Sequence, residues 1–140
     1  MAFTKQISVF LSNKSGRIAD VAELLAKNGI DLRALSIADG ENYGALRMIT
    51  DNQDKALSIL KAANFTAKLT DVLAVEIPNE PGSLSKILTA LQNNGIGIDY
   101  IYAYVGVDAA KARVIIRVSD NELAESVLNG IGVELIEGNK

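Results

Sequence analysis

The sequence contains no cysteine and no histidine in its 140 residues. Their absence excludes disulfides, thiol nucleophiles, thiolate or imidazole metal ligands, and the commonest general base of enzymes. No convergent acid–base pair replaces them, so we expect a protein that is not an enzyme and that uses no metal or other cofactor. A chain without cysteine also suits the cytoplasm, where thiols stay reduced.

Positive charge and long hydrophobic runs are also scarce. The net charge is −3 and the sequence pI is about 4.9, whereas a general nucleic-acid binder is normally basic. No apolar run approaches the roughly 20 residues that a membrane span needs. Residues 1–6 lack the apolar segment and the cleavage site of a signal peptide. With 49% apolar and 22% charged residues, we expect a globular cytoplasmic protein without nucleic-acid or membrane partners.

One short stretch occurs twice, and the rest of the chain repeats around it. Residues 13–18 (NKSGRI) and 79–84 (NEPGSL) each follow an alternating apolar run and open an amphipathic one. Gly82 follows Gly16 by 66 residues (82 − 16), and the apolar positions of the following helix recur at the same offset. The triplet at 28–30 (NGI) recurs identically at 94–96. A repeat that keeps both core and turn residues predicts two homologous modules, residues 1–71 and 72–140.

Each module is expected to have the order βαββαβ. Period-two and helical patterns place the elements of the first module at residues 7–11, 18–25, 30–38, 43–50, 51–63 and 65–70. Those of the second are expected at 73–77, 84–91, 96–103, 112–119, 120–128 and 133–137. In both second strands the apolar parity shifts, which suggests a β-bulge. Asp51 and Asp120 are expected to cap the second helices. Nothing between residues 70 and 73 resembles a flexible linker, so the modules should be tightly coupled.

This order predicts an α+β protein made of two ferredoxin-like modules, a fold that serves many functions. RNA-recognition domains of this order need aromatic residues on the middle strands, and residues 45–50 and 112–119 have none. Metal-transfer domains need cysteine pairs. An acylphosphatase-like anion loop would use an arginine near position 17, but the second copy has Ser83 there. A nucleotide sensor would want a basic phosphate loop, for which Lys14 and Arg17 are thin support.

The two turns in their βαββαβ context resemble the ACT domain, a small-molecule-sensing module that usually binds amino acids. The resemblance covers nearly the whole chain, twice. It implies modules joined side by side through their second strands, giving one eight-stranded antiparallel sheet with helices on one face. Ligands would lie where the turn of one module faces the second strand of the other. One implied site comprises Asn79, Gly82, Ser83 and Leu84 with Ser36, Ile37 and Ala38. The pseudo-equivalent site comprises Asn13, Gly16, Arg17 and Ile18 with Tyr102, Ala103 and Tyr104.

The chemistry of the turns agrees with an amino-acid ligand, although plainer interpretations remain. A helix N-terminus presents unpaired N–H groups to a carboxylate, and glycine permits close approach of the backbone. An asparagine amide can bind both charged groups of an amino acid. Equally, Gly16 and Gly82 can serve only a tight turn, and the asparagines can be turn residues. Arg17 is more often a solvated helix residue, and the tyrosines at 100, 102 and 104 favour a module interface over a ligand wall.

The sequence therefore predicts a non-catalytic sensor that binds a free amino acid between two ACT modules and regulates amino-acid metabolism or transport. A regulated enzyme or transcription factor would be its partner. The outer strands 65–70 and 133–137 leave room for a homodimer. The alternative is a structural or oligomerisation module without a ligand.

Overall fold

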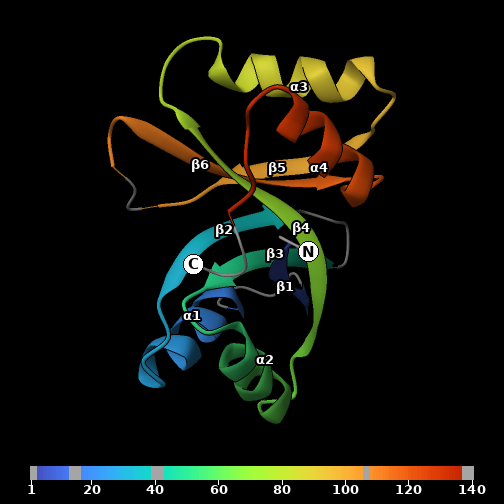
Figure 1. The fold of residues 1–140 in the computed structure, drawn as a ribbon. Helices are drawn as coiled ribbons and strands as arrows, with labels where there is room; N and C mark the ends of the chain where they lie inside the picture. The colour runs from blue at the N-terminus through green and yellow to red at the C-terminus, as the bar shows by residue number, and fades with distance from the viewer. Residues whose placement is uncertain (1–2, 13–16, 39–42, 106–107, 137–140) are drawn as a thin grey trace. The chain divides into compact units, whose positions relative to one another are not determined.

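The computed structural model describes residues 3–12, 17–38, 43–105 and 108–136 (Figure 1). The chain forms two compact units. One is Lys5–Thr70, and the other is the chain from Asp71 onward together with Phe3 and Thr4. Among the described helices, none is long and apolar enough to cross a membrane.

The first unit has the expected ferredoxin-like order. Its elements are β1 (Thr4–Ser12), α1 (Arg17–Lys27), β2 (Leu32–Ala38), β3 (Tyr43–Thr50), α2 (Gln53–Ala62) and the beginning of β4 (Thr66–Pro78). Neighbouring strands follow the order β2-β3-β1-β4, with β3 antiparallel to both β1 and β2. Helices α1 and α2 contact each other and lie on the same side of these strands (Figure 1).

The second unit repeats this arrangement. The end of β4 is its first strand, followed by α3 (Ser83–Asn93), β5 (Ile98–Ala103), β6 (Lys111–Val118) and α4 (Asn121–Gly130). The strand order is β4-β6-β5, and both pairings are antiparallel. After α4 the chain returns to the free side of β4, where Leu135 forms a bridge with Val75 and the Ile136 N–H donates to Ala74 O at 2.7 Å.

The expectation of eight strands was wrong, because the described residues form six. Residues 65–70 and 73–77 were expected to be separate strands, but the thirteen residues of β4 run through both positions. No glycine or proline interrupts β4 before its last residue, so nothing ends the first strand. Within residues 133–136 only Leu135 forms a β-bridge and no strand is formed, and residue 137 lies outside the described residues. Among the strands that the structure describes, β2 has only β3 as a neighbour and β5 has only β6.

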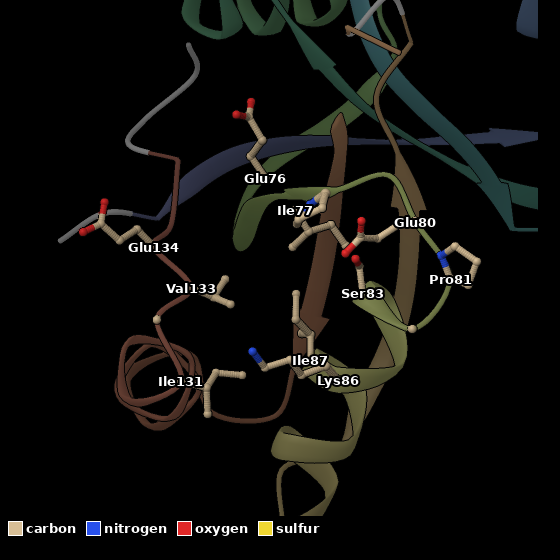
Figure 2. A pocket seen from close by; sticks show the side chains of 13 residues that line it. Glu76, Ile77, Glu80, Pro81, Ser83, Lys86, Ile87, Ile131, Val133 and Glu134 are labelled. Carbon is tan, nitrogen blue, oxygen red and sulfur yellow. The ribbon is translucent and has the colours of Figure 1, made fainter. Parts of the chain in front are cut away.

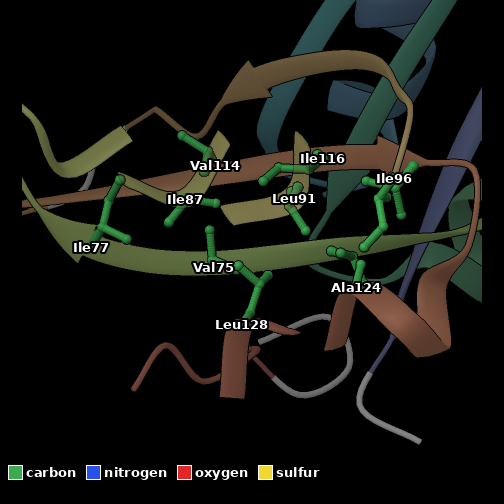
Figure 3. Close-up of a cluster of buried hydrophobic side chains, with 11 residues drawn as sticks. Val75, Ile77, Ile87, Leu91, Ile96, Val114, Ile116, Ala124 and Leu128 are labelled. Atoms are coloured by element: carbon green, nitrogen blue, oxygen red, sulfur yellow. The ribbon is translucent and has the colours of Figure 1, made fainter. Parts of the chain in front are cut away.

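Each unit buries its own hydrophobic core between its helices and one face of its strands. Figure 3 shows the core of the second unit, in which Ile87 and Leu91 of α3 and Leu128 of α4 point toward Val75 and Ile116 of the strands. The core of the first unit uses the corresponding helix positions, Val21 and Leu25 of α1 and Leu60 of α2. The helical spacing read from the sequence is therefore confirmed in both modules.

The repeated NGI triplets end the first helix of each module in the same way. Gly29 and Gly95 both have φ +71°, the left-handed conformation that glycine adopts without strain. The next residue donates its N–H back to the helix, from Ile30 to Leu25 O and from Ile96 to Leu91 O, both at 3.0 Å. The expected bulges in the second strands are confirmed as register shifts at Leu32/Ala34 and Ile98/Tyr100.

One of the two expected caps was misplaced by a residue. Asp120 caps α4 by accepting from the Leu123 N–H at 3.1 Å, as expected. Helix α2 is instead capped by Asn52, which accepts from the Lys55 N–H at 3.1 Å. The Asp51 carboxylate accepts from the Asp31 N–H at 3.0 Å, so it holds the start of β2. Asp51 and Asp120 both stand before a helix in the sequence. The sequence pattern did not reveal that the Asp51 carboxylate binds the N–H of Asp31, which is 20 residues away.

Candidate functional site

The turn from β4 into α3 presents backbone donors at the start of the helix. Gly82 is the N-cap residue and has no side chain with which to cap α3. The Ser83 N–H donates to Glu80 O at 3.3 Å, and the Lys86 N–H donates to Gly82 O at 3.0 Å. Among the described residues, the N–H groups of Leu84 and Ser85 have no acceptor. Such unpaired donors, together with the positive end of the helix dipole, favour a carboxylate.

Glycine at position 82 is explained by its backbone conformation. Its φ is +92° and its ψ is −16°, a left-handed geometry that other residues adopt only with strain. A Cβ atom added there would meet no heavy atom within 4 Å. The side of Gly82 that would carry a side chain is therefore open space, which leaves this face of the turn accessible.

A cavity of about 470 Å³ lies beside this turn, within the second unit. Its volume falls in the range of roughly 300–1,000 Å³ that is typical of small-molecule sites. The lining comes from the end of β4 and the turn (Glu76, Ile77, Pro78, Glu80, Pro81, Gly82), from the start of α3 (Ser83, Lys86, Ile87), and from the segment after α4 (Ile131, Gly132, Val133, Glu134). Figure 2 shows Glu80 and Ser83 on one side, Val133 and Glu134 on the other, and Ile87 between them.

The charged groups around the cavity differ in how they are paired. Glu76 is held by Arg113 at 2.6 Å and by Lys111 at 3.1 Å. The hydrogen bonds from Arg113 and then Lys111 lower the pKa of the Glu76 carboxyl below its ordinary value. Glu80, Lys86 and Glu134 form no ion pair within the part of the chain that the structure describes. The cavity thus has apolar walls, one ammonium group and two carboxylates that can meet a ligand of opposite charges.

Two of the four predicted turn residues of this site, Gly82 and Ser83, line the cavity, and the other two do not. The Asn79 amide donates to Ala109 O at 3.0 Å, and the Asn79 N–H donates to Ala110 O at 3.0 Å. These bonds hold the turn against the hairpin before β6. Leu84 lies on the exposed side of α3. Contacts of Asn79 and Leu84 with a ligand stay predictions.

The residues of the other predicted turn are partly outside the described residues. Asn13 and Gly16 belong to residues 13–16, which lie outside the described residues. Arg17 is the first residue of α1; its guanidinium lies 3.5 Å from the Asp20 carboxylate and 4.7 Å from the centre of the Phe65 ring. The side chain of Ile18 is exposed.

The predicted strand residues lie on the second strand of each unit. Ser36, Ile37 and Ala38 pair with β3, and Ile37 is exposed on this edge strand. On the other unit, Tyr102 and Ala103 pair with β6, and the Tyr104 N–H donates to Arg113 O at 2.9 Å. The Tyr100 and Tyr102 rings stack with their centres 6.4 Å apart. Each set would complete a turn of the opposite unit, and that arrangement stays a prediction.

Sequence reasoning missed most of the cavity lining. Residues 133 and 134 were expected to begin the last strand, and residues 131–134 carried no sign of a site. Lys86 lies on the helix expected at residues 84–91 and was not among the predicted site residues. A weak signal for Lys86 and Ile87 as lining residues was their position in the first turns of the helix that begins at the repeated turn.

Comparisons with known proteins agree with this fold. The family model described as ACT domain pair matches residues 1–139. The solved structure of protein BT0572 from Bacteroides thetaiotaomicron is 40% identical, with a TM-score of 0.89, over 97% of this chain and 93% of that one. The ligand-free regulatory subunit of aspartate kinase from Thermus thermophilus is 22% identical, with a TM-score of 0.67, over 94% and 92% of the two chains. The curated proteins gave no match.

The fold and the repeated turn define a tandem of regulatory α+β modules. The chain belongs to the ACT domain pair family, since the family model spans almost its whole length. The likeness to the Thermus subunit supports the fold. The resemblance read from the two turns is thereby confirmed.

Proposed function

We propose that this protein is a non-catalytic sensor that binds a free amino acid at the turn from β4 into α3. Family membership supports small-molecule sensing as its role. The main observation behind the proposal is the cavity of about 470 Å³ that Gly82 and Ser83 line. The unpaired N–H groups of Leu84 and Ser85 mark the nearby end of α3 as the place for a carboxylate.

The ligand-bound state involves a second module in this proposal. The turn of the second unit is completed by Ser36, Ile37 and Ala38 of a β2 strand, from this chain or from a second copy. Support comes from the position of β2 at the edge of the sheet: among the described strands it pairs only with β3, and an edge strand has backbone groups left to bond. Binding between modules would couple the ligand to their arrangement, which a partner enzyme or transcription factor would read.

Isothermal titration calorimetry with the twenty standard L-amino acids tests the proposal, with thermal shift as a second readout. We expect saturable heat and a raised melting temperature with at least one of them. Lys86→Gln should weaken that binding, whereas Lys61→Gln, on α2 and outside the cavity, should not change it. If no amino acid gives heat or a thermal shift, the chain is better described as an oligomerisation module without a ligand.

A further inference from the structure

The two modules can be compared position by position at the cavity. Arg17 is the first residue of α1, and Ser83 is the first residue of α3. Phe65 and Val133 also correspond, because each follows a left-handed residue at the end of the second helix. Their N–H groups donate to Leu60 O at 3.0 Å and to Leu128 O at 2.9 Å, and those two leucines occupy matching core positions.

In the first module these positions hold large side chains that contact one another. The Arg17 guanidinium lies over the Phe65 ring, 4.7 Å from its centre. A cation over an aromatic face is attracted by the negative face of the ring. Arg17 also pairs with Asp20, the fourth residue of α1, at 3.5 Å. The cation of this module therefore already has an aromatic face and a carboxylate of its own chain.

In the second module the same positions hold small or oppositely charged side chains. Serine replaces the arginine and valine replaces the phenylalanine, and both Ser83 and Val133 line the cavity. Lys86, the fourth residue of α3, stands where the first module has Asp20. Its side chain points toward Ile131 (Figure 2), and its ammonium has no hydrogen bond or ion pair among the described residues.

We infer that the ligand site is the cavity of the second module, and that this cavity takes a zwitterionic α-amino acid with an aliphatic side chain. This rests on the proposed function. The carboxylate of the ligand meets Lys86, and its ammonium faces one of the two carboxylates, Glu80 or Glu134, which lie on opposite sides of the cavity. Its side chain lies against the isoleucines and the valine that wall the cavity. In the first module, Arg17 and Phe65 take the place of a ligand.

The aliphatic preference follows from the walls of the cavity. Ile77 and Ile87 are buried, and Ile131 and Val133 are partly buried in the same hydrophobic core. An aliphatic side chain placed there is stabilised because its apolar surface is removed from water. A charged side chain would lose hydration against these apolar walls.

Calorimetry on the full chain tests the inference with L-valine, L-leucine and L-isoleucine, and with L-aspartate and L-lysine as contrasts. We expect one bound molecule per chain and at least tenfold tighter binding of the aliphatic amino acids. Two bound molecules per chain, or tighter binding of aspartate or lysine, would overturn the inference and leave the proposed function intact. No binding of any amino acid would overturn both.

Four variants locate the site. Ser83→Arg and the double variant Ser83→Arg/Val133→Phe place the larger side chains in the cavity and should weaken binding at least tenfold. Thr89→Arg, six residues along the same helix, exposed and outside the cavity lining, is the matched control and should bind as the parent does. Arg17→Ser should also leave the affinity of the second-module cavity unchanged. Loss of binding in folded Arg17→Ser, or parental binding in both Ser83 variants, would place the ligand elsewhere; circular dichroism verifies folding.

Discussion

Gly82→Ala separates the conformational role of this glycine from its role at the ligand site. At φ +92° an alanine is strained by about 1–2 kcal/mol. Alanine also lowers the conformational entropy of the unfolded chain, which offsets about 0.4–1 kcal/mol of this loss in stability. The added Cβ meets nothing within 4 Å, so packing contributes no further cost. The free energy of unfolding should fall by roughly 1 kcal/mol, which for 140 residues lowers the melting temperature by about 3 °C.

Gly95→Ala is the matched control for this prediction. Gly95 is in the same unit, has φ +71° and also has open space around the added Cβ, but it does not line the cavity. Both variants should lose similar stability in thermal melts. Only Gly82→Ala should weaken amino-acid binding in calorimetry, since its methyl group projects at the open face of the turn. Equal affinities of the two variants would refute the assignment of this face to the ligand. A stability loss above about 3 kcal/mol in Gly82→Ala would refute the argument from backbone strain alone.

Three further predictions concern the stability of the two units. Because the pKa of Glu76 is lowered in the folded state, its pairing with Arg113 stabilises the protein above the ordinary pKa of 4.5 and is lost as the pH falls through the lowered value. Glu76→Gln should flatten the fall in melting temperature below pH 4.5, and an unchanged acid profile would contradict this. Leu128→Ala, in a fully buried position of α4, should destabilise the second unit by about 2–5 kcal/mol in urea unfolding. Gln53→Leu should lower the free energy of unfolding by about 2–4 kcal/mol, because the buried Gln53 side chain accepts from the Thr50 N–H at 2.9 Å and donates to Lys5 O at 2.6 Å. A neutral effect would contradict this and mean that water satisfies these groups.

The repeat made most of the fold predictable from the sequence. The helix-ending glycines at 29 and 95, the bulges and the buried helix positions all follow from local patterns that occur twice. The fused strand β4 did not follow, since a strand boundary between 70 and 73 was assumed from the repeat without a residue that would cause it. The number of strands thus depended on whether a residue such as glycine or proline ends the strand near residue 71. A periodic pattern of apolar residues does not show this.

The site was only partly predictable for a different physical reason. The turn motif identified Gly82 and Ser83, which line the cavity. The cavity also depends on Val133, 50 residues further along (133 − 83), in a segment whose counterpart in the first module contributes Phe65. The offset between the modules grows from 66 to 68 before this point, as the caps Asn52 and Asp120 show (120 − 52). A comparison at a fixed offset therefore misaligns the residues that decide whether the space is filled.

Amide chemical shifts during a titration test the central claim most directly. A ¹⁵N-labelled chain titrated with the tightest-binding aliphatic amino acid should show its largest perturbations at the N–H groups of Ser83, Leu84 and Ser85 and at Gly132 beside the cavity. The amides of Arg17 and Ile18 should change far less. Perturbations concentrated at Arg17 and Ile18, or of equal size in both helix starts, would contradict the account of the ligand site in the second module.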